Sequence, residues 1–289
     1  MSRKPILLTV AALVIMTMAC SISINGPVTQ VKTGPTVTEE ISVPFLEDTE
    51  ELAHVSLMFG SGTLTLSPGA EDSMISGTAT FNVEDFRPHV TTEGRRVRIE
   101  QGNLDISGIP DFRDDVINDW NLFLSTAPME LTIEAGAYNG NFELGGLALQ
   151  SLEISDGAAD VEVSFSEPNL VEMDLFTYNT GASTVSISGL ANTNCSTFIF
   201  RSGAGSYTLD FSGELAQDMT VNLESGLSSL TIIMPEGTAT EVRTEGGMLN
   251  VSTSGGWDRD GDDYVLSGDG YVITILVKMG AGSLTLTTE

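Results

Sequence analysis

Four aspartates near the C-terminus are the residues whose spacing most suggests metal chemistry. They are Asp258, Asp260, Asp262 and Asp263, interrupted by Gly261. Carboxylate oxygens at alternate positions suit Ca²⁺. However, the glycine is the fourth residue of this run, whereas the EF-hand loop needs glycine at its sixth position, and Asp-Gly is also a common hairpin turn. The four aspartates are therefore a weak candidate calcium site, because their spacing does not match the EF-hand loop. We expect no other metal site and no cofactor.

A second group of acids raises the alternative of a polysaccharide-cleaving enzyme. Glu153, Asp160, Glu162 and Glu167 lie close together in the sequence. Glycoside hydrolysis needs two carboxylates at a defined separation, one of them with a raised pKa. Most of these acids alternate with apolar residues, as expected for the solvated face of a strand. We therefore predict no catalytic residue and a protein that is not an enzyme, with a carbohydrate-active enzyme as the alternative.

The scarcity of cysteine and histidine disfavours nucleophilic and zinc chemistry. The chain has two of each residue. Cys195 has only His54 and His89 as possible bases, so we interpret it as a small, buried apolar side chain. Serine-rich turns also have no nearby histidine, which removes support for a Ser-His-Asp triad.

The other cysteine, Cys20, follows a segment built like a secretory signal. Arg3 and Lys4 precede an apolar run from Ile6 to Ala19, which is shorter than the ~20 residues that a membrane-spanning helix needs. The end of the run resembles a bacterial lipoprotein signal, although Thr17 stands where that pattern usually has leucine. We predict a signal peptide over residues 1–19 and lipidation of Cys20, which would anchor the protein to the extracytoplasmic face of a bacterial membrane.

Composition separates a tether from a folded domain. Residues 20–48 contain prolines among Thr, Val, Gly and Ser without a sustained period, which predicts a flexible tether. Residues 49–289 are predicted to form one repeat-built domain. The chain has 289 residues, 40 of them Asp or Glu and 12 Lys or Arg, and a net charge of −28. This charge excludes nucleic acid as the main partner, whereas 41% hydrophobic residues indicate a packed core.

A repeat of about 22 residues runs through the domain. Its unit is a short apolar-polar alternation, a glycine, and a second alternation, as in Leu152, Ile154, Gly157, Val161 and Val163. Each alternation predicts a strand with one buried face, and the glycine is suited to a sharp turn. The predicted turn glycines are Gly60, Gly136, Gly157, Gly181, Gly203, Gly226, Gly247 and Gly280. The copy around Gly247 has threonine in two apolar positions, Thr244 and Thr253.

These units predict an all-β fold, namely a β-solenoid of stacked rungs that pair in parallel. A β-sandwich of regular hairpins is the alternative. Two regions interrupt the repeat. Between residues 66 and 131 we predict strands at Thr78–Val83 and Val97–Ile99, a turn at Glu93-Gly94, and a loop or a short helical turn over Asp105–Asp119. Gly255–Gly270 is predicted to be an inserted hairpin.

Two stretches, Ser166–Leu215 and the closing Met279–Leu286, resemble the toastrack, LiaF-like and adhesin-like group of bacterial envelope domains. The resemblance covers about residues 50–289. It implies a β-solenoid-like domain outside the membrane, without an agreed catalytic site, which is linked in some members to envelope stress and described in others as adhesive. Unlike LiaF-like proteins, this chain has no block of several transmembrane helices.

Together these features predict a non-catalytic cell-envelope lipoprotein. Its solenoid surface would serve adhesion, scaffolding or partner binding. The expected partners are the membrane, through the lipid, and an envelope protein or cell-surface polymer that is cationic, neutral or bridged by divalent ions. The alternative is an envelope-stress regulatory module that binds a sensor protein.

Overall fold

The computed structural model describes residues 28–46, 51–103, 109–111 and 116–289. The predicted signal peptide and Cys20 lie outside the described residues. Within them, no helix is both long and apolar enough to cross a membrane. Two 3-10 helices, η1 (Glu84–Phe86) and η2 (Leu190–Thr193), are the only helical segments among the described residues; the rest of the regular structure is β.

The described strands follow one another along the chain as β1 (Val28–Gln30), β2 (Val37–Val43), β3 (Ala53–Pro68), β4 (Ile75–Phe81), β5 (Pro88–Glu93), β6 (Arg96–Gln101), β7 (Ile109–Asp111), β8 (Asn118–Leu124), β9 (Met129–Glu143), β10 (Leu149–Ser164), β11 (Met173–Ser188), β12 (Cys195–Asp210), β13 (Met219–Met234), β14 (Thr238–Thr253), β15 (Trp257–Asp260), β16 (Asp263–Leu266) and β17 (Asp269–Thr288). Strands β1 and β7 pair in parallel as a separate two-stranded sheet. All other strands belong to one large sheet.

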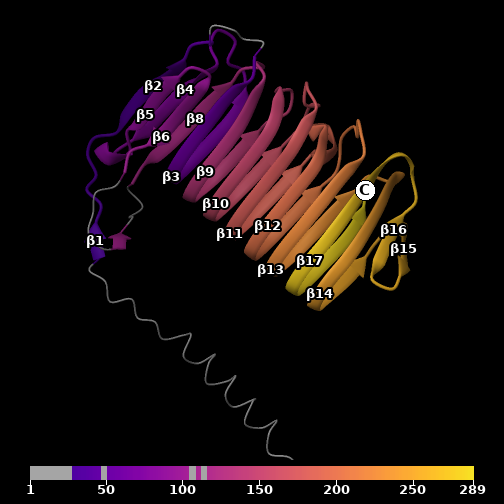
Figure 1. Cartoon of the computed structure of the whole chain (residues 1–289). Coiled ribbons are helices and arrows are strands. Elements are labelled where there is room, and N and C mark those ends of the chain that lie inside the picture. Colours follow the sequence, from indigo (N-terminus) through magenta and orange to yellow (C-terminus); the bar gives the residue numbers. More distant parts are fainter. Residues whose placement is uncertain (1–27, 47–50, 104–108, 112–115) are drawn as a thin grey trace, which may run out of the picture. The chain divides into compact units, whose positions relative to one another are not determined.

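Eight long strands of the large sheet pair in parallel in the order β3, β9, β10, β11, β12, β13, β17, β14 (Figure 1). Their register places equivalent repeat positions side by side: Leu152 pairs with Phe176, and Phe176 pairs with Phe198. Parallel stacking of equivalent positions confirms the predicted solenoid. The alternative sandwich is wrong, because a sandwich would join successive strands through antiparallel hairpins.

Each long strand folds back on itself at its central glycine. Phe200 and Tyr207 are seven residues apart, which would separate them by about 23 Å in a straight strand. Their ring centroids instead lie 5.1 Å apart, on either side of Gly203. A rung therefore has two halves that face each other across the core. We call the halves before the glycine the first layer and the halves after it the second layer.

The apolar residues of both layers meet between the layers. In β10, Leu152 and Ile154 of the first layer and Val161 and Val163 of the second layer are at most 1% exposed. Aromatic rings extend this core from rung to rung, because Phe176 and Phe198 lie 4.6 Å apart between centroids. No rung could bury these side chains alone, so each rung depends on its neighbours for stability.

The loops that join successive rungs are held by two buried asparagines. The side chain of Asn169 accepts a hydrogen bond from the Leu149 backbone N–H (2.9 Å) and donates one to the Leu149 carbonyl (2.8 Å). Asn192 donates to the Phe165 carbonyl at 2.8 Å. Neither residue could be predicted from the sequence, because two asparagines in unlike loops give no periodic signal.

The last rungs do not stack in sequence order. Strand β17 lies between β13 and β14, so Gly280 stacks on Gly226 and Gly247 stacks on Gly280. The predicted inserted hairpin exists as β15 and β16, with β16 antiparallel to β14. Composition explains the order, since β14 carries Thr244 and Thr253 at positions that are apolar in other rungs. The more apolar β17 therefore takes the interior position and β14 the end.

The first rung is extended by the region between β3 and β9. Strand β6 pairs in parallel with the first-layer half of β3, and β8 pairs in parallel with its second-layer half. Strands β4 and β2 then continue the second layer in antiparallel pairing. The predicted strands at Thr78–Val83 and Val97–Ile99 correspond to β4 and β6. The turn predicted at Glu93-Gly94 lies one residue later, at Gly94-Arg95, because Glu93 is the last residue of β5 and pairs with Arg96.

Two further sequence predictions need correction. The tether predicted over residues 20–48 includes two strands, Val28–Gln30 (β1, paired with β7) and Val37–Val43 (β2, paired with β4). The alternation of exposed and buried residues in β2 is too short to be recognised without the partner strand. The loop predicted over Asp105–Asp119 overlaps β7 and the start of β8. Residues 104–108 and 112–115 lie outside the described part.

Candidate functional site

The outer face of the second layer is a wide surface of hydroxyl and amide side chains. Its positions are fixed by the register of eleven strands, from β2 through β4, β8, β3, β9, β10, β11, β12, β13 and β17 to β14. The hydroxyl and amide residues are Thr38, Ser42, Ser76, Thr78, Thr80, Asn121, Thr63, Thr65, Ser67, Asn139, Asn141, Ser164, Thr184, Ser186, Ser188, Ser206, Thr208, Ser229, Thr231, Ser283, Thr285, Thr287, Asn250, Ser252 and Ser254. We call this surface the hydroxyl face.

The remaining positions of the hydroxyl face are acidic or apolar, and none is Lys or Arg. They are Glu40, Asp119, Glu143, Asp160, Glu162, Asp210, Phe123 and Ile233. Phe123 is the only aromatic residue among them and is 37% exposed. Because basic side chains are missing from its described positions, the face offers hydrogen bonds and some negative charge but no anion-binding group.

Hydrogen bonds between strands order parts of the hydroxyl face. The hydroxyl groups of Thr38 and Thr80 lie 3.0 Å apart, and those of Ser254 and Thr287 lie 2.9 Å apart. Neighbouring strands are spaced about 4.8 Å apart, so each row repeats at that interval along the solenoid. Each hydroxyl group can donate one hydrogen bond and accept two. The rows therefore form a regular array of donors and acceptors.

Two carboxylates of this face are engaged with the return loops. Glu143 accepts hydrogen bonds from the Ser164 hydroxyl at 2.7 Å and the Gly145 backbone N–H at 2.7 Å. Burial by itself would raise the pKa of Glu143, but the hydrogen bonds from Ser164, Gly145 and Ser166 outweigh it and lower the pKa. Asp210 accepts from the Ser212 backbone N–H at 2.8 Å. These two carboxylates stabilise loops rather than offering a free acid.

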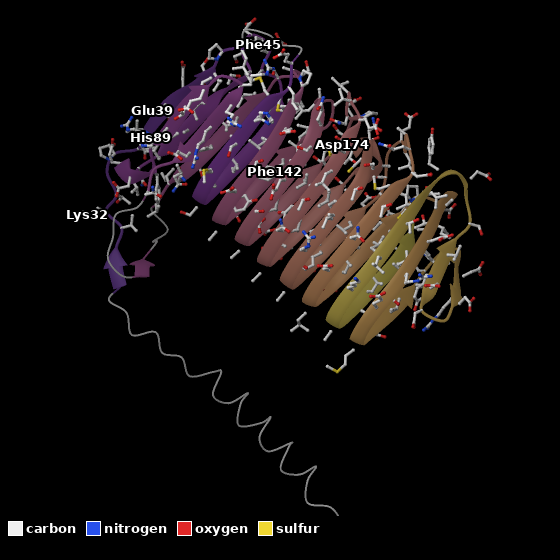
Figure 2. The ribbon with its side chains drawn as sticks, viewed as in Figure 1. Lys32, Glu39, Phe45, His89, Phe142 and Asp174 are labelled. Atoms are coloured by element: carbon white, nitrogen blue, oxygen red, sulfur yellow. The ribbon has the colours of Figure 1, made fainter. Side chains whose placement is uncertain are left out.

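The outer face of the first layer is different, because it carries alternating charges. Across neighbouring rungs, Arg201 approaches Glu224 with 3.5 Å between nitrogen and oxygen, and Lys278 approaches Glu245 with 3.9 Å. These side chains are all about half exposed, so each pair contributes at most about 1 kcal/mol. The basic residues here are matched by acids, in contrast to the hydroxyl face. Figure 2 shows side chains projecting along the whole visible face of the ribbon.

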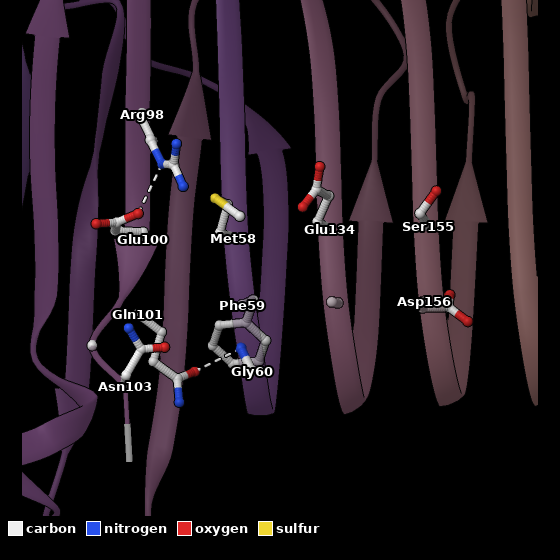
Figure 3. Close-up of a pocket in the computed structure, with 12 residues that line it drawn as sticks. Met58, Phe59, Gly60, Arg98, Glu100, Gln101, Asn103, Glu134, Ser155 and Asp156 are labelled. Atoms are coloured by element: carbon white, nitrogen blue, oxygen red, sulfur yellow. Dashed lines mark hydrogen bonds and ion pairs between the residues drawn. The ribbon is translucent and has the colours of Figure 1, made fainter. Parts of the chain in front are cut away.

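A hollow of about 640 Å³ lies on the first layer beside the bend of β3, β9 and β10 (Figure 3). On its β6 side, Arg98 and Glu100 form an ion pair at 2.8 Å. Gln101 closes one end by accepting hydrogen bonds from the Gly60 N–H at 2.9 Å and from Asn118 Nδ2 at 2.8 Å. These polar groups are occupied by one another. The hollow therefore has the character of a structural joint between β6 and the solenoid.

A polar cluster lies at the bend, where its central residue Asp156 also lines this hollow. Asp156 accepts hydrogen bonds from the Tyr178 hydroxyl at 2.8 Å and from the Thr180 hydroxyl at 2.5 Å. Burial raises the pKa of Tyr178 far above its ordinary value, and the nearby Tyr138 and Asp156 raise it further. Tyr178 is therefore a neutral hydrogen-bond donor in the folded state. The cluster ties β10 to β11 where the strands turn.

His54 and Glu130 form a pair on β3 and β9 that the sequence analysis did not anticipate. His54 Nδ1 lies 2.5 Å from Glu130 Oε2, and both side chains are substantially exposed. A carboxylate orients histidine in this way in serine hydrolases. Ser56 follows on the same face of β3, but within the described residues it makes no hydrogen bond to His54. The pair is thus a cross-strand contact that lacks an activated nucleophile.

The carboxylates considered for glycoside hydrolysis lie on opposite faces. Glu153 is on the outer face of the first layer, whereas Asp160 and Glu162 are on the outer face of the second layer. Glu167 is in the exposed loop after β10. The core separates the two faces, so Glu153 cannot act together with Asp160 or Glu162 on one glycosidic bond.

The four aspartates of the candidate calcium site lie in the hairpin of β15 and β16. Asp258 and Asp260 are on β15, Asp262 is in the turn, and Asp263 is on β16. Asp263 forms a two-pronged pair with Arg243, whose hydrogen bonds lower the pKa of Asp263. Among the described residues, no group of three or more His, Cys, Asp or Glu side chains is arranged to hold a metal ion.

Cys195 lies at the start of β12 and is fully buried. Burial raises the pKa of its thiol to about 11, despite the hydrogen bond that the thiol donates to the Thr197 carbonyl at 2.9 Å. A thiol that stays protonated at neutral pH is a poor nucleophile. The sequence interpretation of Cys195 as a buried, unreactive side chain agrees with this environment.

Comparison with known proteins relates the chain to one family. Residues 32–175 match the model of the N-terminal domain of toast_rack, DUF2154. No curated protein matches the sequence significantly.

Among solved structures, a candidate cell adhesion protein from Clostridium sporogenes is 17% identical, with a TM-score of 0.48 over 88% of this chain and 100% of that chain. A candidate adhesin from Parabacteroides merdae is 10% identical, with a TM-score of 0.38 over 91% of this chain and 99% of that chain. A candidate lipid binding protein from Parabacteroides distasonis is 10% identical, with a TM-score of 0.41 over 89% and 99% of the two chains.

Proposed function

Residues 32–175 of this chain belong to the toast_rack N-terminal family, and from the geometry of the rungs we propose that the chain is a non-catalytic, adhesin-like protein of the bacterial cell envelope. The hydroxyl face is its adhesive surface. Its ligand is a neutral, polyhydroxyl polymer, such as an uncharged glycan of a cell surface. The observation that carries this proposal is the array of Ser, Thr and Asn side chains across eleven strands, which contains no Lys or Arg.

The chemistry of the face selects the ligand class. Sugar hydroxyl groups donate and accept hydrogen bonds, as the Ser and Thr hydroxyl groups of the face do. An anionic polymer is disfavoured, because the face carries Asp160 and Glu162 and the chain has a net charge of −28. For a cationic polymer, we expect no preference between the two outer faces. Basic and acidic side chains alternate on the first layer, so that layer should bind such a polymer no better than the hydroxyl face does.

Repetition compensates for the weakness of single contacts. One hydrogen bond between neutral groups contributes about 0.5–1.5 kcal/mol. A long polymer lying across several rungs makes many such contacts, and after the first contact the others form within the same complex. The expected behaviour is weak binding of short oligosaccharides and firm binding of long or insoluble polymers.

The proposal places the solenoid on the outer face of a membrane. Lipidation of Cys20 would hold the chain there, and the acidic surface would keep the exposed strands soluble. Cell fractionation tests this part separately: Cys20→Ser should move the protein from the membrane fraction to the soluble extracytoplasmic fraction. A variant that remains wholly in the membrane fraction would contradict lipid anchoring. That result would not bear on the adhesive role of the hydroxyl face, which is tested separately.

The adhesive face is tested by capture of the full chain on insoluble cellulose, chitin and starch. Thr208, Thr231 and Thr285 are neighbours in one row on β12, β13 and β17. Changing all three to valine keeps their shape and strand preference but removes the hydroxyl groups. We expect this variant to lose most of the capture by the polymer that binds the unmodified protein.

The same three strands provide the control. Thr197, Thr220 and Thr274 form a matching row on the outer face of the first layer. Changing these three to valine should leave capture unchanged. Equal loss in both variants, or failure of all three polymers to capture the unmodified protein, would contradict a glycan-binding hydroxyl face.

A further inference from the structure

The outer edge of β14 changes character at its central glycine. In the first layer, Thr240–Arg243 pairs with the hairpin strand β16. In the second layer, residues 246–253 pair with β17 on one side, and no described strand pairs with the other side. The hairpin of β15 and β16 thus extends the first layer by two strands while the second layer stops at β14 (Figure 1). The solenoid ends in a step one layer high.

Core-facing side chains are uncovered at this step. Leu230 and Leu284 face the core from β13 and β17 and are at most 2% exposed. Val251 occupies the same row in β14 and is only half-buried, as is Leu249 two residues before it. In the first layer, where β16 provides cover, Val242 is 1% exposed. The missing neighbour therefore leaves apolar surface exposed in the second layer alone.

The hairpin forms the floor of the step. Trp257 pairs with Leu266, and Leu266 pairs with Thr240, so the Trp257 side chain lies on the core side of the hairpin. Its indole Nε1 is buried and has no hydrogen-bond partner among the described residues. Arg259 stacks over the ring of Tyr264, with 5.3 Å from its guanidinium carbon to the ring centroid. The core side of this floor therefore carries the indole ring of Trp257 and the guanidinium of Arg259 over Tyr264.

The exposed edge lacks the usual protection against pairing. Natural edge strands are commonly blocked by charged residues or proline. Residues 246–256 contain neither, although the chain as a whole carries 40 acidic residues. Acids instead outnumber bases beside the segment: Glu245, Asp258, Asp260 and Asp262 lie near its ends, against Arg259 and Lys278, of which Lys278 is paired with Glu245. The edge is therefore open to a strand, and its surroundings favour a strand with basic flanks.

We propose that this step binds one extended segment of a partner protein, which adds to the second layer as a strand beside residues 246–253. The segment has apolar residues at alternate positions that cover Leu249 and Val251, and basic residues on its flanks. Backbone hydrogen bonds provide affinity and the alternate side chains provide specificity, as in other cases of strand addition. The site is the free backbone edge and the core-facing side of β14, whereas the outward side chains Asn250 and Ser252 of the same strand belong to the hydroxyl face. The proposal does not depend on the proposed function.

A single strand fits the step better than a second copy of the chain. Every rung has two layers. A second copy that paired through the second layer of its own β14 would therefore also bring the first layer of that copy up to the step. That place is taken by the hairpin of β15 and β16. One strand needs only the vacant position in the second layer.

The test uses a labelled peptide and fluorescence anisotropy with the full chain. The probe is KAGSLTLTTK, which copies the second-layer half of β17 over Ala281–Thr288 and adds a lysine at each end. This half already pairs in register with β14 on its inner side. The control probe has proline at the positions of Ser283 and Thr285, because proline donates no backbone hydrogen bond and interrupts a strand.

Two lysine variants separate the step from general electrostatics. Val251→Lys places a charge on the core-facing side of the step, whereas Asn250→Lys places the same charge on the outer side of the same strand. We expect saturable binding of the first probe, a loss of affinity of about tenfold or more for Val251→Lys, and little change for Asn250→Lys. Thermal unfolding of both variants should match the unmodified protein, because Val251 is already partly exposed.

Several results would overturn the proposal. They are the absence of saturable binding, equal binding of the proline probe, or equal losses in the two lysine variants. Sedimentation of the chain without peptide tests the other occupant, because a dimer that Val251→Lys dissociates would assign the step to a second copy. A failure of glycan capture would not affect any of these measurements.

Discussion

The carbonyl oxygen of Gly157 lies 2.3 Å from the position that a Cβ atom would occupy on Gly181. The same close approach recurs at neighbouring rungs, where Gly203 faces the Gly181 carbonyl at 2.6 Å and Gly226 faces the Gly203 carbonyl at 2.6 Å. The bends of successive rungs therefore stack with backbone against backbone, and only glycine leaves room for this. The repeat period visible in the sequence is a consequence of that contact.

Gly181→Ala should destabilise the solenoid, because the new methyl group must push the backbone of the neighbouring rung away. We expect a loss of about 1–3 kcal/mol in the free energy of unfolding, measured in urea. Gly247→Ala is the control, since its Cβ would lie 3.3 Å from the Gly280 carbonyl at the end of the stack. Equal losses in the two variants would show that close stacking does not fix the bends.

Tyr178→Phe should cost about 1 kcal/mol, because it removes the hydrogen bond to Asp156 and leaves that carboxylate with fewer donors. Tyr271→Phe makes the same change at a side chain that is 51% exposed and should be neutral. Urea unfolding at pH 7 measures both variants. If Tyr178→Phe were as neutral as Tyr271→Phe, the bend cluster would have no part in stability.

Alkaline pH should destabilise the folded protein through the same tyrosine. The pKa of Tyr178 is raised in the folded state above its ordinary value of 10.0, mainly by burial. Above that pH the unfolded chain releases the proton more readily than the folded chain, so stability falls as pH rises. Tyr178→Phe should make this decline shallower. The measurement is the free energy of unfolding between about pH 9 and pH 11, a range that brackets the ordinary tyrosine pKa. If its slope with pH were the same in Tyr178→Phe as in the unmodified protein, Tyr178 would not be the group responsible.

Acidic pH should remove a contribution from Glu143. Its pKa is lowered in the folded state, so its contribution is fully present above the ordinary value of 4.5 and is lost as pH falls below it. Because Glu143 is partly exposed, we expect less than about 1 kcal/mol. Comparison of Glu143→Gln with the unmodified chain should show a stability difference at pH 7 that vanishes in acid. A difference independent of pH would contradict the proposed role of its hydrogen bonds.

Cys195 should react with thiol reagents only after unfolding. Its thiol is fully buried and has a pKa of about 11. Incubation of the native protein with a maleimide should leave Cys195 unlabelled, whereas labelling in urea should be complete. Rapid labelling of the native protein would show that β12 opens readily at its start.

The sequence predicted the rungs well because glycine and alternating apolar residues are local signals that repeat. Gly157 and Gly181 can be placed at bends, and Leu152 and Phe176 in one core row, from the sequence alone. The order of β14 and β17 in the sheet could not be predicted from these local signals. That order depends on competition between β14 and β17 for the interior place, and the sequence shows only a hint of it in Thr244 and Thr253.

The surfaces were less predictable than the core. Outward positions were expected to be polar and often acidic, which holds for Asp160 and Glu162. However, the difference between the two outer faces depends on how each strand folds at its glycine, and the linear pattern treats both halves alike. Strand β2 was missed for a related reason, because Val37–Val43 has meaning as a strand only beside β4.

The most direct test of the hydroxyl face is to measure which side of the solenoid a bound glycan protects. Thr231→Cys and Thr220→Cys place a thiol on the second-layer and first-layer outer faces of the same strand, β13. Maleimide labelling rates are measured with and without the polysaccharide that captures the protein, in a Cys20→Ser background in which the buried Cys195 is silent. We predict that the polymer slows labelling severalfold at Thr231→Cys and leaves Thr220→Cys unchanged. Equal protection at both positions, or none at Thr231→Cys, would contradict the account.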